Sequence, residues 1–284
     1  MIKMSKNYKS APLPFQGQKR FFIAKFKEAL KLYPSDATYV DLFGGSGLLS
    51  HNVKYVYSNS KVVFNDFDNY SKRLKAIPET NKILEDLRAL ELDAPRGKKL
   101  GRNDRNKVLD VLYRANEANY VDWISLSGSL KFSMNYGSCI DDFVNDTMYN
   151  TIRKSNFPEA SDYLEGIHVV RKHYKELFNE YKHIDGVVFL VDPPYLSTDT
   201  NTYNSLEYWK LRDYLDVLDL LHDHSYFYFT SNKSQIVELC EWVETRTADN
   251  ANPFKKANCT MTANKTSHNS GYTDIMYHLN RNDE

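Results

Sequence analysis

Residues 187–195 read VVFLVDPPY, an uninterrupted apolar run that ends in an acid, two prolines and a tyrosine. A short run rich in β-branched and aromatic residues predicts a strand covered on both faces, as in a parallel α/β sheet. Proline fixes φ and donates no hydrogen bond, so the strand must end in a rigid turn. Ligands bind beyond the carboxyl ends of strands in such folds, which makes this turn a candidate site.

Further strand-like runs flank this stretch at residues 38–43, 61–64, 226–230 and 272–279. Helical spacing of apolar residues appears between them, at residues 19–33, 206–221 and 234–243. The alternation predicts a doubly wound α/β sheet. The polar stretch 249–270 predicts a loop or a hairpin near the end of the sheet.

Residues 71–165 interrupt the alternation. They contain helical patterns at 71–92 and 108–119, a basic loop at 96–107, and a segment at 125–136 rich in Ser, Gly and aromatic residues. We therefore expect an N-terminal part of a catalytic domain at 1–70, an inserted and mainly helical region at 71–165, and the rest of the catalytic domain at 166–284.

The formal net charge of the 284-residue chain is zero, whereas a dedicated nucleic-acid binder usually has a basic surplus. Charge is nevertheless segregated: residues 1–31 hold eight Lys and Arg against one acid, and residues 96–114 hold seven against two. These runs indicate either solvated faces or phosphate contacts. The three Cys and eight His show no metal-ligand spacing, and no apolar run approaches the length of a membrane span.

A Gly-rich turn at residues 40–47, VDLFGGSG, follows the first predicted strand, and Asp66 ends the second. Glycines allow close backbone approach to a ligand, and a helix N-terminus favours negative groups. Asp66 is placed to bind ribose hydroxyls. A plain strand–helix turn remains an alternative, as does a dinucleotide site, although Ser50 stands where that pattern requires a third glycine.

The residue types of the 192–195 turn suit the methylation of an aromatic amine, whose lone pair is delocalised into its ring. The Asp192 carboxylate and the Pro193 carbonyl can each accept one N–H bond, which holds the amine and favours a nucleophilic nitrogen. Tyr195 can stack on a base. A base within a duplex must first leave the stack, because its target atom is otherwise inaccessible.

Together with PFQGQK at residues 14–19, these motifs resemble those of the Dam-like DNA adenine methyltransferases, in the same order and across nearly the whole chain. The resemblance implies a Rossmann-like AdoMet-dependent methyltransferase sheet carrying an inserted target-recognition region. It also implies AdoMet as cofactor without a metal, double-stranded DNA as partner, and site-specific N6 methylation of a flipped adenine. We expect a protein of the cytoplasm of a bacterium or phage-infected cell, with or without a cognate restriction endonuclease.

The resemblance assigns roles residue by residue. The catalytic residues it implies are Asp192, Pro193, Pro194 and Tyr195. The cofactor-binding residues it implies are Phe15, Gln16, Lys19, Asp41, Phe43, Gly44, Gly47, Asp66 and Asp192. Among basic residues of the inserted region, we expect DNA contacts from Lys98, Lys99, Arg102, Arg105 and Lys131.

Two departures and several alternatives accompany the resemblance. Gln18 replaces the second glycine of the N-terminal motif, and the segment 128–137 is similar only loosely to the family's G-x-F-N-x-P-x-G. We expect residues 198–204 to close over the flipped base. Cytosine N4, RNA or a protein side chain are alternative targets, and an inactive DNA-binding relative is a further alternative. Covalent cytosine-C5 chemistry is disfavoured because no Cys follows a Pro.

Overall fold

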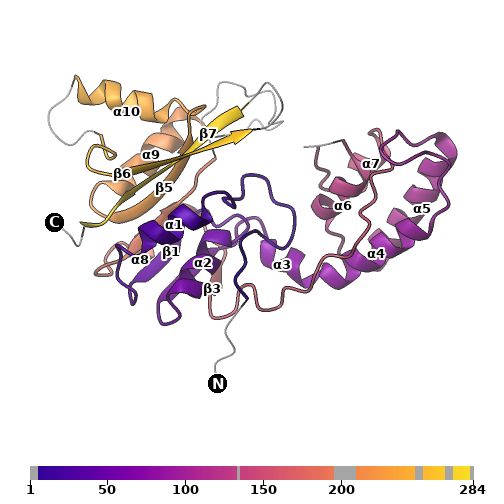
Figure 1. Ribbon diagram of the computed structural model, residues 1–284, viewed down its shortest axis with the longest axis horizontal. Helices are drawn as coiled ribbons and strands as arrows, with labels where there is room; N and C mark the ends of the chain where they lie inside the picture. The colour runs from indigo at the N-terminus through magenta and orange to yellow at the C-terminus, as the bar shows by residue number, and fades with distance from the viewer. Residues whose placement is uncertain (1–5, 133–134, 195–208, 247–251, 266–270, 282–284) are drawn as a thin grey trace. The chain divides into compact units, whose positions relative to one another are not determined.

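The computed structural model describes residues 6–132, 135–194, 209–246, 252–265 and 271–281. The chain divides into two compact units, and most of their helices and strands are labelled in Figure 1. The first unit contains residues 1–9, 19–68 and 166–284. The second contains residues 10–18 and 69–165, so that the N-terminal stretch 10–18 packs with the inserted region.

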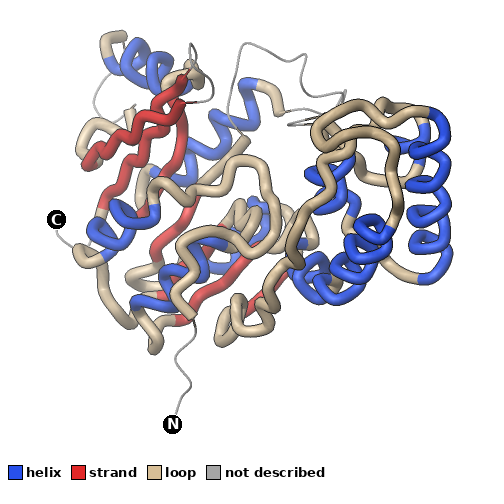
Figure 2. Tube along the Cα trace, turned by 45° about the vertical axis from the view of Figure 1, so that its right-hand side comes forward, coloured by secondary structure: helices blue, strands red, loops and turns tan. Residues whose placement is uncertain are grey.

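The first unit is built on a seven-stranded sheet with the order β3-β2-β1-β4-β5-β7-β6, drawn in red in Figure 2. The first five of these strands are parallel, and β7 runs antiparallel to both of its neighbours. The strands are β1 (Thr38–Asp41), β2 (Lys61–Asn65), β3 (His168–Val170), β4 (Val188–Val191), β5 (Ser225–Ser231), β6 (Asn258–Lys265) and β7 (Gly271–Leu279). The expected doubly wound α/β sheet is confirmed, and residues 249–270 contribute the first strand of a terminal hairpin.

Alternate residues of the central strands enter two separate cores, as the period of a strand requires. Val188 and Leu190 of β4 face the core that contains α1 and α2, whereas Phe189 and Val191 face the core that contains α8, α9 and α10. Burial on both faces explains why β4 reads as an unbroken apolar run. The helices of this unit are α1 (Ile23–Leu30), α2 (Leu48–Val56), α8 (Tyr174–Tyr181), α9 (Leu211–Leu221) and α10 (Ile236–Glu244).

The connections leave the middle of the sheet in opposite directions. From β1 the chain proceeds to β2 and then β3 on one side, and from β4 it proceeds to β5 on the other. The carboxyl ends of β1 and β4 therefore flank the topological switch point, where open α/β sheets bind ligands. The Gly-rich turn follows β1, and Asp192, Pro193 and Pro194 follow β4.

The second unit contains helices and loops among its described residues. The helices are α3 (Tyr70–Lys75), α4 (Ile77–Ala89), α5 (Arg102–Ala118), α6 (Trp123–Leu130) and α7 (Asp141–Val144). The single helix predicted over 71–92 is divided at Ala76, with Pro78 in the first turn of α4, where its missing N–H costs nothing. The expected basic loop 96–107 is also wrong in part, because α5 begins at Arg102.

Candidate functional site

The Gly-rich turn adopts backbone conformations that depend on glycine. Gly45 and Gly47 have φ of 52° and 70°, and Gly47 directly precedes α2. The N–H of Gly47 closes the turn on the carbonyl of Gly44 at 2.7 Å. Gly44 has a different reason to be glycine, since a Cβ there would lie 2.2 Å from the Phe64 ring and 2.8 Å from the carbonyl of Asn65. The turn is thereby held against the end of β2.

Asp41, the last residue of β1, is completely buried at the start of this turn. The hydroxyl of Ser50, in α2, donates to its Oδ2 at 2.7 Å. Oδ1 is buried and has no hydrogen-bond partner among the described residues. Burial raises the pKa of Asp41 to about 7, with a further increase from the charge of Asp192, while Ser50, the Phe43 backbone N–H and Lys19 act in the opposite direction. Asp41 therefore offers one oriented acceptor to a cationic ligand.

The acid of the 192–195 turn lies beside the lysine of the N-terminal motif. Lys19 Nζ contacts Asp192 Oδ2 at 2.5 Å, and the two side chains are only 6% and 19% exposed. Burial raises the pKa of Asp192, Lys19 opposes that increase, and the charge of Asp274 on β7 adds to it. Pro193 is buried and Pro194 is exposed, whereas Tyr195 and the predicted closing segment 198–204 lie outside the described residues.

The end of β2 supplies the next acid, Asp66, which is 4% exposed and donates its N–H to the carbonyl of Val170 at 2.8 Å. The preceding Asn65 joins three strand ends. Its Nδ2 donates to the carbonyls of Leu42 and Lys172, at 2.9 and 3.0 Å, and its Oδ1 accepts the N–H of Lys172 at 3.0 Å. Asn65 thus fixes the chain at Leu42, within the Gly-rich turn.

Phe43, inside the turn, contacts two aromatic rings that come from later elements. Its ring centroid lies 5.0 Å from that of Tyr174 and 5.4 Å from that of Trp209. Tyr174 is 7% exposed at the start of α8. The three rings form an apolar wall next to the Gly-rich turn.

Phe15 and Gln16, the other expected cofactor contacts, belong to the second unit. Phe15 packs edge-on against Tyr70 with centroids 5.8 Å apart, and the Tyr70 hydroxyl bonds both the N–H and the carbonyl of Leu13. Arg73 donates to the carbonyl of Pro14 at 2.8 Å while its Nε pairs with Asp122 at 2.9 Å. The segment is therefore held firmly on α3, and Gln16 is exposed.

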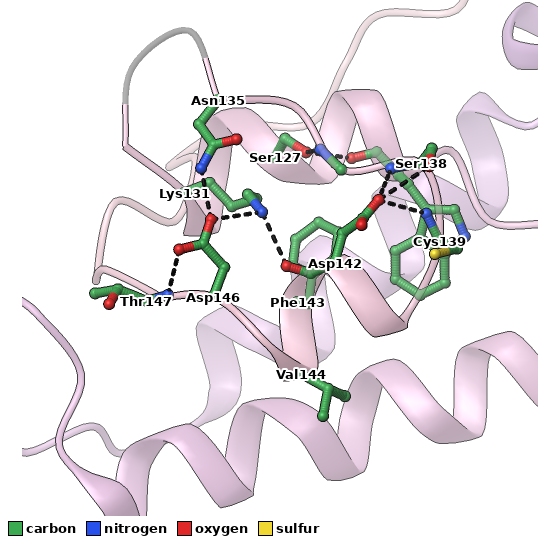
Figure 3. A network of polar contacts seen from close by, with 12 residues as sticks. Ser127, Lys131, Asn135, Ser138, Cys139, Asp142, Phe143, Val144, Asp146 and Thr147 are labelled. Carbon is green, nitrogen blue, oxygen red and sulfur yellow. Dashed lines mark hydrogen bonds and ion pairs between the residues drawn. The ribbon is translucent and has the colours of Figure 1, made fainter. Parts of the chain in front are cut away.

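The basic residues of the inserted unit differ in exposure. Lys98, Lys99 and Arg102 are exposed, and Arg105 is partly buried with its guanidinium on the carbonyls of Phe143 and Val144. Lys131 is buried, and its Nζ lies 2.9 Å from both Asp146 Oδ2 and the carbonyl of Asp142, as Figure 3 shows. In this arrangement the charge of Lys131 is neutralised inside the unit, so its geometry indicates a structural role in place of the expected DNA contact.

Sequence reasoning missed Ser50, Asn65 and Asp274 as parts of the site. In the sequence, Ser50 stands out only as the residue that replaces the third glycine of a dinucleotide motif, and Asn65 stands out only because it directly precedes Asp66. In the described part of the chain, no cluster of three or more His, Cys, Asp or Glu side chains could hold a metal ion. No helix within the described residues has the length and apolar character needed to cross a membrane.

Comparison with known proteins adds three findings. Residues 15–257 match the family described as D12 class N6 adenine-specific DNA methyltransferase. A Haemophilus influenzae protein assigned as a methyltransferase is 31% identical over 255 residues, which cover 88% of this chain and 85% of that protein. The solved structure of precorrin-6Y C5,15-methyltransferase from Geobacter metallireducens aligns over 96% of this chain and 99% of its own at 10% identity. The TM-score of this alignment is 0.38.

Proposed function

Because the chain belongs to the D12 class N6 adenine-specific DNA methyltransferases, we propose that it methylates the N6 amine of an adenine flipped out of duplex DNA. Family membership, together with the Rossmann-like methyltransferase sheet and its inserted helical unit, implies AdoMet as the methyl donor. The observation that carries the proposal is the grouping of Asp41, Lys19 and Asp192 at the topological switch point, where their charges act on one another.

The residues after β1 and β2 fit AdoMet. Oδ1 of Asp41 is a buried acceptor without a hydrogen-bond partner among the described residues, and it suits the ammonium of the methionine part. Asp66 lies at the strand end where an acid accepts hydrogen bonds from ribose hydroxyls. Phe43 offers an apolar surface, and the Gly44–Gly47 turn brings backbone close to the ligand. Phe15, Gln16 and Lys19 are proposed to complete the cofactor site.

The 192–195 turn is proposed to hold the amine. Lys19 occupies Oδ2 of Asp192, which leaves Oδ1 to accept one N6–H, and the Pro193 carbonyl accepts the other. Pro194 keeps the turn rigid, and Tyr195 stacks on the flipped base. When bound, AdoMet supplies a methyl group activated by its positively charged sulfur. The Asp192 carboxylate and the Pro193 carbonyl would orient the N6 lone pair toward that methyl group, and Asp192 would accept the proton that the amine loses on methylation.

Duplex DNA is proposed to contact the exposed basic residues Lys98, Lys99 and Arg102, with a smaller contribution from Arg105. Neutralising phosphates releases counterions, so binding should weaken steeply as salt increases. The inserted unit is proposed to read the recognised sequence.

Transfer of label from methyl-labelled AdoMet to duplex DNA tests this function. We expect label in adenine with the wild type and none with Asp192→Ala. Lys31→Met serves as a surface control, since that side chain is 64% exposed. Label in cytosine, in RNA or in protein would change the target while keeping the methyltransferase assignment. If AdoMet binds but no label appears in any DNA, the chain is a non-catalytic relative.

A further inference from the structure

Phe132 is the most exposed large apolar side chain among the described residues, at 68%. It directly follows the buried Lys131, at the end of α6 in the inserted unit. Single exposed apolar residues are common on protein surfaces and need no explanation by themselves. The surroundings of Phe132 are more informative than its exposure.

Tyr149 lies next to Phe132, with ring centroids 6.0 Å apart and an angle of 54° between the planes. Its backbone N–H donates to the carbonyl of Leu130 at 2.8 Å, which ties the residue to the end of α6. Tyr149 is only partly buried. Two aromatic side chains from distant positions in the sequence are thus held together at the surface of this unit.

A lysine completes the group. Tyr149 pairs with Lys99 in an isolated antiparallel bridge. The flanking hydrogen bonds run from Leu100 N–H to the Met148 carbonyl and from Asn150 N–H to the Lys98 carbonyl, at 2.9 and 2.8 Å. This pattern makes Lys99 and Tyr149 a non-hydrogen-bonded pair. In such a pair the two side chains lie on the same face of the ladder and are closer together than in a hydrogen-bonded pair. Lys99 and Tyr149 therefore face each other across this bridge, and the Tyr149 ring lies beside that of Phe132.

The polar network in Figure 3 holds Lys131 and Asn135, which lie on either side of Phe132 in the sequence. Lys131, the residue before Phe132, is anchored by Asp146 and by the carbonyl of Asp142. Asn135 donates to the same Asp146 carboxylate at 2.5 Å, and its N–H donates to the Phe132 carbonyl at 3.0 Å. A surface that is already ordered loses little conformational entropy when a partner binds.

We infer that Lys99, Tyr149 and Phe132 form a surface that binds duplex DNA, with Lys99 on a phosphate and the two rings against a base or deoxyribose. The inference rests on the proposed function. The neighbouring Lys98 and Arg102 are exposed as well, so the charge of this surface is complementary to a phosphate backbone. An aromatic ring beside cations is the combination by which proteins hold bases that have left the regular stack.

The two kinds of contact predict different binding behaviour. Loss of a phosphate contact flattens the dependence of log K on log salt by about 0.9 per phosphate. Loss of a stacking ring should weaken binding about tenfold at every salt concentration and leave the slope unchanged. The experiment measures anisotropy of a fluorescein-labelled duplex with the full-length protein over a series of NaCl concentrations.

Four variants test the inference. Phe132→Ala should lower affinity at constant slope, Phe132→Trp should keep it, and Lys99→Gln should flatten the slope. Tyr113→Ala, an exposed aromatic residue on α5 with 43% exposure, is the matched control and should bind like the wild type. Thermal unfolding confirms that each variant is folded, which is expected because the altered side chains are largely at the surface.

Wild-type protein must first be shown to methylate duplex DNA, so that a failure of the proposed function is recognised separately. If the wild type methylates DNA and Phe132→Ala binds as tightly as Tyr113→Ala, this inference is overturned while the proposed function stands. If the wild type binds no duplex even at low salt, both are overturned.

Discussion

Replacing Lys19 by Met should impair methyl transfer most at acidic pH, because Lys19 favours the ionised form of the partly buried Asp192. The ammonium and carboxylate lie 2.5 Å apart and are 6% and 19% exposed. At an effective dielectric constant of about 20, two unit charges about 4 Å apart attract each other by about 4 kcal/mol. A factor of ten in rate corresponds to about 1.4 kcal/mol. The rate at a fixed acidic pH should therefore fall by roughly ten- to a thousandfold.

The sign of the pH effect follows from the direction of the pKa shift. Burial already raises the pKa of Asp192, and loss of Lys19 removes the cation that opposes this increase. The acidic limb of the rate profile should therefore move to higher pH. In the unfolded chain Asp192 ionises near pH 4. Lys19→Met should therefore have nearly the same free energy of unfolding as the wild type at acidic pH, where Asp192 is protonated, and should become less stable than the wild type as Asp192 ionises. At high pH that loss should approach about 3–5 kcal/mol, as for other broken buried ion pairs.

The assay measures initial methyl-transfer rates across pH with saturating AdoMet and DNA, together with urea unfolding at an acidic and an alkaline pH. Lys19→Arg should retain most activity because it retains the charge, and Lys31→Met should behave like the wild type. The reasoning is refuted if the acidic limb of Lys19→Met coincides with that of the wild type and its loss of stability is independent of pH.

Three further predictions concern the cofactor site and the inserted unit. Ser50→Ala should weaken AdoMet binding measured by calorimetry and move the acidic midpoint of that binding above about pH 7, since Ser50 lowers the raised pKa of Asp41. Ser60→Ala, which removes a buried hydroxyl elsewhere in the unit, is the control. Equal AdoMet binding by the two variants would argue against this role of Ser50. Arg73→Met should lower the free energy of unfolding by about 3–5 kcal/mol by leaving Asp122 buried and unpaired; a loss below about 1 kcal/mol in urea titrations would show that the pair is unimportant. Charge reversal at Lys98, Lys99 and Arg102 should raise the dissociation constant for duplex DNA and flatten its salt dependence, and unchanged values would exclude these residues from the interface.

The sheet was largely predictable because its central strands are buried on both faces. Residues 187–191 and 226–230 show this as uninterrupted apolar runs, and both lie in the sheet within a residue or two of their expected ends. Strand β3 has only three residues, two of them exposed, so it shows no such run. Helix α8 was also missed, although Tyr174, Leu177 and Phe178 have helical spacing and are buried together.

The site residues that could be predicted from the sequence are the acids that stand at the ends of strands. Asp41, Asp66 and Asp192 each follow or end a strand, and the chain order alone places them at one edge of the sheet. Partners across the fold were not predictable, because their pairing depends on tertiary contacts. Lys131 shows this most clearly. Its sequence neighbourhood predicts a DNA contact, whereas in the structure it forms an ion pair with Asp146, fifteen positions away.

The identity of the methylated base tests the central claim most directly. DNA from cells that lack their own adenine methylation, expressing either the wild type or Asp192→Ala, is hydrolysed to nucleosides and analysed by mass spectrometry. The proposed function predicts N6-methyladenine with the wild type and none with Asp192→Ala at equal protein levels. N4-methylcytosine with the wild type, or N6-methyladenine that persists in Asp192→Ala, would contradict it.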